Sequence, residues 1–362
     1  MSSNQSSSKS GNKKTSAYDG AFEQHLIDHG IFFNNRAQKP DNWKEINHRM
    51  AQPRPSLSPS CFSDAAFETF VQTNEDALTE ATVMSKAFPV ITGSANIPSA
   101  ENLPFGNLKD LTDGSLVKAR PDFYDGSHPA EIDEPIRKDL GSYIVPSTNT
   151  AAPCLPNFFT EGKGPTGSAI VGRRQACYDG TLGARGIHEL RSCTSPETIY
   201  DNNAYTITST YHGATGDLTI YTTHPTPSTD PSNPVGYRMT QLNGWKMTGN
   251  PETFRQGATA LRNARDWAKE QRDELVTAAN SRVVDMPMET STLESSGHSI
   301  LSSSTNEPIL LESDTSADEL ALNDSVSVNS SHKRLAGRSE KRPSNPGPKR
   351  RPKKSTRAVK CS

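Results

Sequence analysis

The uneven distribution of apolar residues along this 362-residue chain most restricts how it can fold. The three tryptophans and the other aromatic residues lie between positions 18 and 282, and they suffice for a sizeable core. Residues 1–17 are mainly Ser, Asn, Lys and Gly, and from residue 283 onward Ser, Thr, Asp, Glu and Pro dominate. These polar ends keep the apolar fraction at 32%, and they predict one folded domain, residues 18–282, between disordered ends.

Charge divides the C-terminal end into two segments. Residues 283–331 carry nine acidic residues and no Lys or Arg, whereas residues 332–362 carry twelve Lys or Arg against one Glu. The net charge of the last segment is therefore about +11, against about −13 for the rest of the chain. Its basic clusters include Lys333, Arg334, Lys341, Arg342, Lys349, Arg350, Arg351, Lys353 and Lys354. Such clusters are typical of nuclear localisation signals or nucleic-acid contacts, so we expect a nuclear protein recognised by an import receptor. A solubilising tail is the alternative.

The cysteines and the N-terminus indicate a compartment. The five cysteines are scattered and form no Cys-x-x-Cys pair. This odd, unpatterned set favours reduced thiols in an intracellular protein over a disulfide framework. The N-terminus has lysines but no apolar segment, and no stretch approaches eighteen apolar residues, so we expect neither secretion nor a membrane partner.

Periodicity predicts a mixed α/β domain. Two β-branched runs around a glycine-containing loop, within residues 204–224, predict a hairpin. Asn250 and Pro251 predict the start of a long helix. The stretch 168–191 is either one helix or a broken pair, because Gly180 and Gly183 interrupt it. The predicted helices cover residues 21–30, 63–88, 131–140, 168–191 and 250–280, and further β-like segments cover residues 115–124 and 156–164. This order of helices and strands favours helices around a central mixed sheet.

The segment PNFFTEGKGPTGS, residues 156–168, contains the strongest candidate for chemistry. A phosphate-binding loop would require a Ser or Thr directly after the lysine, but Gly164 and Pro165 follow Lys163, so that interpretation is rejected. Glu161 and Lys163 stand two apart, and residues two apart on a strand point to the same face of a sheet. The segment therefore predicts a carboxylate and an ammonium side by side.

Together with Pro121-Asp122 at another predicted strand edge, Glu161 and Lys163 resemble the motif of the PD-(D/E)xK nuclease superfamily. The resemblance implies a restriction-endonuclease-like core, with Asp122 and Glu161 as magnesium ligands and Lys163 supporting the attacking water or the phosphate. Gln175 follows in the next predicted helix, where RecB-like members of that superfamily often place a glutamine. Hard carboxylate oxygens suit Mg²⁺, which lowers the pKa of bound water and neutralises charge that develops on phosphorus. The alternative is that Asp122 caps a turn and the other two side chains are solvated.

The domain is also similar to a family of fungal proteins built on a domain of unknown function. The similar stretches are KPDNWKEINHRMAQPRPSLSPS, PNFFTEGKGPTGS, RRQACYDGTLGARG, YDNNAYTITSTYH and GNPETFRQGATALRNARDWAKEQRD. This resemblance implies no activity. The sequence therefore leaves two hypotheses, which are a magnesium-dependent nuclease and a catalytically inactive nuclear interaction or scaffold protein.

Other charged residues have two interpretations each. Arg173, Arg174 and Arg185 are expected either to hold a nucleic-acid backbone or to pair with Asp179 and Glu189. His188 and His212 also fall near the motif. For both, the sequence favours a structural or surface role over general base catalysis. His25 and His29 stand four apart on a predicted helix, as metal ligands often do, but the sequence offers no further ligand and favours a surface or packing role for them.

Overall fold

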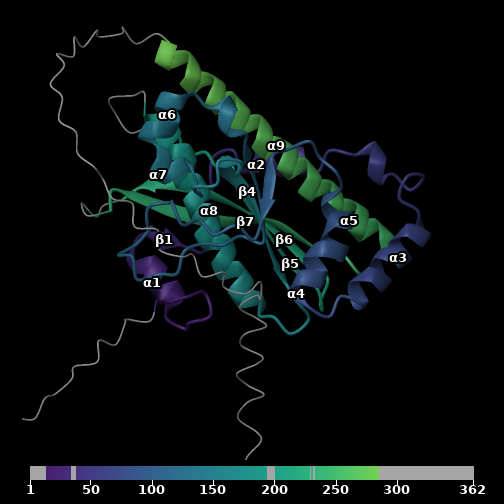
Figure 1. Cartoon of the computed structure of the whole chain (residues 1–362). Coiled ribbons are helices and arrows are strands. Elements are labelled where there is room, and N and C mark those ends of the chain that lie inside the picture. The colour runs from purple at the N-terminus through teal and green to yellow at the C-terminus, as the bar shows by residue number, and fades with distance from the viewer. Residues whose placement is uncertain (1–13, 34–37, 194–199, 229, 231–232, 285–362) are drawn as a thin grey trace, which may run out of the picture. The chain divides into compact units, whose positions relative to one another are not determined.

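A computed structural model describes residues 14–284, except 34–37, 194–199, 229 and 231–232 (Figure 1). Residues 1–13 and 285–362 lie outside the described residues. The second range contains the whole basic tail 332–362 and the expected acidic segment 283–331 except its first two residues, which end the final helix. Seven strands form one mixed sheet in the order β1-β7-β6-β5-β4-β3-β2. They are β1 (Ile31–Phe32), β2 (Ser99–Glu101), β3 (Phe123–Ser127), β4 (Cys154–Lys163), β5 (Thr206–His212), β6 (Asp217–Pro227) and β7 (Val235–Lys246).

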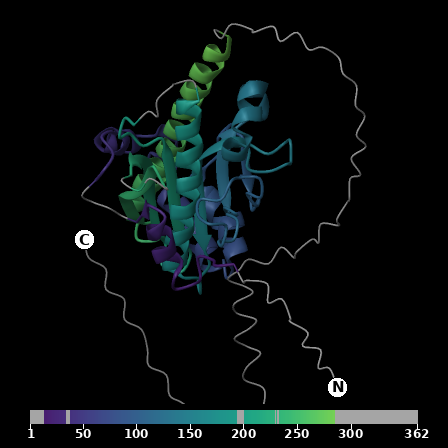
Figure 2. The same ribbon diagram turned by 90° about the vertical axis from the view of Figure 1, so that its left-hand side faces the viewer.

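Helices cover both faces of this sheet, so the expected mixed α/β architecture is confirmed. They are α1 (Phe22–Asp28), α2 (Trp43–Met50), η1 (Pro55–Leu57), α3 (Asp64–Glu75), α4 (Glu80–Thr82), η2 (Val83–Ala87), α5 (Phe88–Thr92), η3 (Pro129–Glu131), α6 (Glu134–Asp139), α7 (Gly141–Ile144), α8 (Ala169–Ser192) and α9 (Pro251–Val284). Figures 1 and 2 show the two longest, α8 and α9, on opposite sides of the sheet.

Two apolar cores follow from the alternation of side chains along the strands. Phe158 of β4 joins a core with α2, α3, α5 and α9, whereas its neighbour Phe159 joins a second core with α1 and α8. The central part of the sheet pairs β3 antiparallel to β4, and β4 parallel to β5. The parallel pair requires a crossover, which α8 provides. Residues on the Phe159 face of β4 therefore lie under α8.

Helix α8 is one continuous helix of 24 residues rather than a broken pair. Its glycines allow close packing on the sheet instead of interrupting the helix. A Cβ atom on Gly183 would lie 2.7 Å from the Phe159 ring and 2.8 Å from the Pro156 carbonyl oxygen. Because real Cβ contacts are longer, only glycine lets α8 approach β4 this closely.

The helix predicted over residues 63–88 is wrong as a continuous element. Helix α3 ends at Glu75, and a new capped turn begins at Thr79, whose hydroxyl accepts a hydrogen bond from the Thr82 backbone N–H. Leu78 lies in the break and is 75% exposed. The break turns the chain so that Glu80 enters the interior, where it is 7% exposed.

The edges of the domain also differ from expectation. The backbone of Thr15 hydrogen-bonds to Ser115 and Val117, and Ala17 is buried, so residues 14–17 pack on the domain. The β-like stretch 115–124 forms a strand only from Phe123. Strand β7 was not predicted. The hairpin of β5 and β6 and the long helix α9 were both predicted. The Asn250 side chain caps α9 by accepting a hydrogen bond from the Thr253 N–H at 2.8 Å.

Candidate functional site

The pairing of β3 with β4 brings Asp122 to Glu161. Phe123 pairs with Thr160, so the residues on either side of that pair face each other across the two strands. The Asp122 N–H donates to Glu161 Oε1 at 3.3 Å, and the Gly162 N–H donates to Asp122 Oδ2 at 2.7 Å. The chain between these strands holds α6 and α7 and still returns in register. Two carboxyl groups from different strands thus share one small region at the start of β3 and the end of β4.

Lys163 directs its ammonium group into the same region. Its Nζ lies 2.9 Å from Glu80, 3.8 Å from Glu161 and 3.9 Å from Asp122. Gly172 of α8 leaves room for the lysine stem, because a Cβ there would lie 3.2 Å from Lys163 Cγ. Burial alone would lower the pKa of Lys163, but the three carboxylates outweigh it and raise that pKa above its ordinary value. Lys163 is therefore a permanent cation inside the domain.

Asp179 of α8 completes the set, which we call the acidic cluster: Glu80, Asp122, Glu161, Lys163 and Asp179. The carboxyl groups of Glu161 and Asp179 hydrogen-bond to each other. Burial raises the pKa of Asp179 to about 7, and burial together with the Asp122 and Asp179 charges raises the pKa of Glu161 well above its ordinary value. Such a contact between two acids requires a shared proton, so Glu161 donates to Asp179.

Three buried oxygen atoms in and beside the acidic cluster have no hydrogen-bond donor other than the proton that Glu161 and Asp179 share. They are Glu161 Oε2, Asp179 Oδ2 and Gln175 Oε1. Gln175 precedes Asp179 by one helical turn and follows Gly172 by three residues, so the three residues share the face of α8 that covers Lys163. Buried acceptors without donors are costly, and a bound cation would satisfy them. The donor set of carboxylate and amide oxygens therefore fits a hard divalent ion such as Mg²⁺.

Sequence reasoning missed Glu80 and the role of Asp179. A signal for Asp179 existed, since it is an acid within the apolar and glycine-rich stretch 176–187 of a predicted helix and so had to be buried. No local signal marked Glu80, because its position depends on the break after α3. The alternative that Asp179 pairs with arginines is wrong, because its partner is Glu161.

The three arginines proposed for nucleic-acid contact have different environments. Arg173 and Arg174 both form ion pairs with Glu23 of α1, at 3.3 Å and 3.7 Å. The Arg174 guanidinium also donates to the carbonyl oxygens of residues 17 and 19, which precede α1. Arg173 is the more exposed of the two. Arg185 is 7% exposed, and its guanidinium donates to the carbonyl oxygens of residues 109 and 110. Arg185 therefore ties α8 to the loop before β3.

The two histidines near the motif have contacts of their own. His212 pairs in register with Lys163, and its Nε2 lies 2.9 Å from the Gly167 carbonyl oxygen. His188 is buried and its ring lies 5.2 Å from that of Tyr200, and burial lowers the pKa of His188. These contacts agree with the structural roles that the sequence favoured.

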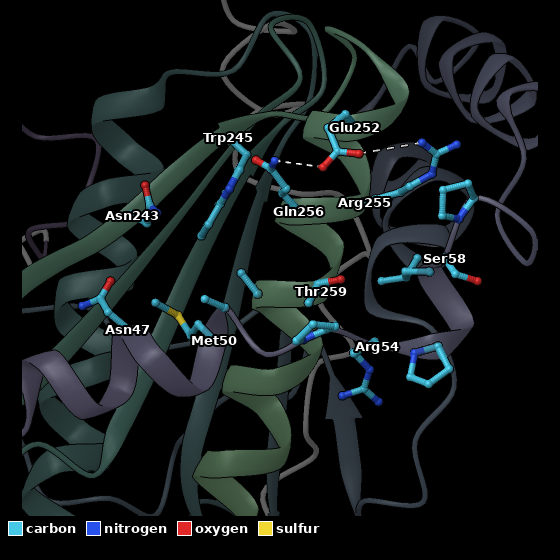
Figure 3. A pocket seen from close by; sticks show the side chains of 16 residues that line it. Asn47, Met50, Arg54, Ser58, Asn243, Trp245, Glu252, Arg255, Gln256 and Thr259 are labelled. Atoms are coloured by element: carbon cyan, nitrogen blue, oxygen red, sulfur yellow. Dashed lines mark hydrogen bonds and ion pairs between the residues drawn. The ribbon is translucent and has the colours of Figure 1, made fainter.

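A large pocket lies elsewhere on the domain, between η1, α2, β7 and α9 (Figure 3). Its volume is about 730 Å³, and Trp245 and Met50 supply apolar walls beside Asn47 and Asn243. Its guanidinium groups already have partners, because Arg54 pairs with Asp266 and Arg255 with Asp64. Among the described residues that line it, none belongs to the acidic cluster. The pocket and the acidic cluster are thus separate features.

Comparisons with protein-family models, with curated proteins and with solved structures each found no match for this chain. Among the described residues, no helix combines the length and the apolar character that crossing a bilayer demands.

Proposed function

We propose that the domain is a PD-(D/E)xK-like nuclease that hydrolyses phosphodiester bonds with a bound divalent cation. The observation that carries this proposal is the meeting of Asp122, Glu161 and Lys163 at adjacent ends of β3 and β4. The order of the core elements supports it, since β2, β3 and β4 are antiparallel neighbours and α8 then crosses to β5, which is parallel to β4. We also propose that the domain belongs to the fungal family of unknown function that its sequence resembles.

The roles follow from the chemistry of each side chain. Asp122 and Glu161 would hold Mg²⁺, and Gln175 and Asp179 offer the neighbouring oxygens. When bound, the ion would lower the pKa of a water molecule and neutralise charge on the phosphate. Lys163, held as a cation, would donate from Nζ to the water or to a phosphate oxygen. Glu80 positions that ammonium group. Arg173, the more exposed of the arginines on α8, is the candidate for backbone contact.

One observation favours the alternative of a catalytically inactive scaffold. Glu161 and Lys163 are each 1% exposed, and Glu80 already pairs with the ammonium group. A substrate could reach Lys163 only if the turn that carries Glu80 moved away. In an inactive scaffold, the same cluster would serve only to fasten that turn to β4.

Cleavage assays distinguish the two functions. Purified full-length protein is expected to cleave DNA or RNA with Mg²⁺ or Mn²⁺ and to lose this activity in EDTA. Glu161→Gln is expected to reduce the rate by at least about 100-fold, because it removes a metal ligand. Asp76→Asn, at an exposed position after α3, should retain full activity. Undiminished cleavage by Glu161→Gln would contradict the proposed role of Glu161 as a metal ligand, and no cleavage of any nucleic acid by the wild type would favour the scaffold.

We also propose that the basic tail directs the protein to the nucleus through an import receptor. Deleting residues 332–362 from a fluorescent fusion is expected to shift it from the nucleus to the cytoplasm, because the deletion removes twelve Lys or Arg residues. Deleting residues 301–331, a segment of equal length without Lys or Arg, is the matched control and should leave the fusion nuclear. A tail-less fusion that stays in the nucleus would refute the signal.

A further inference from the structure

A second set of metal-binding side chains lies on the surface at α1. His25 and His29 stand one helical turn apart, and their rings lie 4.5 Å apart between centroids. The loop before β3 contributes Asp113, whose Oδ1 lies 3.4 Å from His25 Nε2. One ligand atom from each of these three residues lies within 4.8 Å of the other two. The fold thus supplies the third ligand that the sequence did not reveal.

The contacts around these side chains prepare them for coordination. His29 Nδ1 lies 2.8 Å from the His25 carbonyl oxygen, so Nδ1 carries the proton and Nε2 keeps its lone pair. A hydrogen bond from the second ring nitrogen to a backbone carbonyl is the usual support of a metal-binding histidine. Ser115 donates to Asp113 Oδ1 from its N–H at 3.0 Å and from its hydroxyl at 2.6 Å. These bonds fix the direction of the carboxylate.

We propose that His25, His29 and Asp113 bind a divalent transition metal ion, with Zn²⁺ as the best fit. Two imidazole nitrogens and one carboxylate oxygen suit zinc and do not suit magnesium or calcium, which prefer oxygen ligands. Ligands bound to zinc at about 2.0–2.2 Å lie roughly 3.3 Å from one another in a tetrahedron. Small side-chain rotations would close the present spacing to that value. Three protein ligands leave one coordination position open to water.

The ion would connect two segments that are distant in sequence. Helix α1 also carries Glu23, which pairs with Arg173 and Arg174 of α8. The Asp113 loop leads to β3 and is joined to the N-terminal segment by the bridge between Thr15 and Leu116. A zinc ion would therefore fasten the N-terminal segment to the loop that precedes Asp122. This role is independent of the proposed nuclease.

Metal titration of the full chain tests the proposal. Protein stripped of metal with a chelator is titrated with Zn²⁺ by calorimetry, and Co²⁺ is used as a coloured substitute that reports its ligand geometry. We expect one saturable Zn²⁺ ion per chain, and affinity at least about tenfold lower in His25→Ala and in Asp113→Ala. Asp113 is exposed, so its replacement leaves the core intact. Bound Zn²⁺ is also expected to raise the midpoint of thermal unfolding.

Two control variants locate the ion. His48→Ala removes an exposed histidine of α2 and should bind zinc as wild type does. Glu161→Gln should also retain zinc, which separates this site from the acidic cluster and from the fate of the nuclease proposal. Absence of saturable binding, or equal binding by wild type and His25→Ala, would overturn the proposal.

Discussion

Lys163→Met is expected to lower the free energy of unfolding at pH 8 by about 3–5 kcal/mol, because removing one partner of a buried ion pair leaves uncompensated charge in the interior. The wild-type ammonium group lies within 4 Å of three carboxyl groups and is almost completely buried. Methionine fills most of the space of the lysine stem, so packing over Gly172 changes little. Urea denaturation monitored by tryptophan fluorescence and circular dichroism measures the loss.

The control for this variant is Lys269→Met. Lys269 pairs with Asp273 on the solvated side of α9, and more than a third of each side chain is exposed. Such pairs contribute at most about 0.5 kcal/mol. The cost of Lys163→Met should also fall at pH 5, where the stranded carboxylates can bind protons. A loss below about 1 kcal/mol, or the same loss at both pH values, would mean that the ammonium group does not hold the cluster together.

Asp179→Asn is expected to stabilise the domain at pH 8 and to have much less effect at pH 5. Burial raises the pKa of Asp179 from an ordinary 3.8 to about 7 in the folded protein. The folded state therefore binds a proton that the unfolded state releases, and this contribution to stability is lost as the pH rises from about 4 through 7. Between pH 5 and pH 8 the wild type should lose about 2–3 kcal/mol that the neutral amide does not lose.

Denaturation of both proteins at several pH values checks this expectation. Asp76→Asn, at an exposed position, should show no pH-dependent difference from wild type. If Asp179→Asn differs from wild type by the same free energy at pH 5 and pH 8, Asp179 does not titrate in this range.

The same linkage predicts that Mg²⁺ binding strengthens with rising pH, since a cation competes with the proton that Glu161 and Asp179 share.

Elements with local signals could be predicted from the sequence. The β5–β6 hairpin has a glycine-containing loop between β-branched runs, and α9 begins at an asparagine cap followed by proline. The alternation of Glu161 and Lys163 on one face of β4 follows from strand geometry alone. The resemblance to the nuclease motif, and not any local pattern, nominated Asp122 as their neighbour.

The remaining features depend on contacts between distant segments. Strand β7 contains Gly236 and Gly244, which lower its strand signal, and pairing with β6 along its length compensates for them. Glu80 reaches Lys163 only because the helix predicted over 63–88 breaks, and nothing local distinguishes that break from a continuous helix. The metal-ligating set at α1 likewise needed Asp113 from a loop. Such residues are found only when the tertiary structure is known.

The glycines of α8 also limit how this domain can change over evolution. Among its contacts with β4, helix α8 approaches the strand closely at two glycines, where Gly172 faces Lys163 and Gly183 faces Phe159. A single inserted residue between Gly172 and Asp179 would rotate the rest of the helix by about 100°. Asp179 would then leave Glu161, and a residue with a side chain would meet the Phe159 ring. We therefore expect homologous chains to vary in length in their surface loops but to keep the spacing between positions 172 and 183 unchanged.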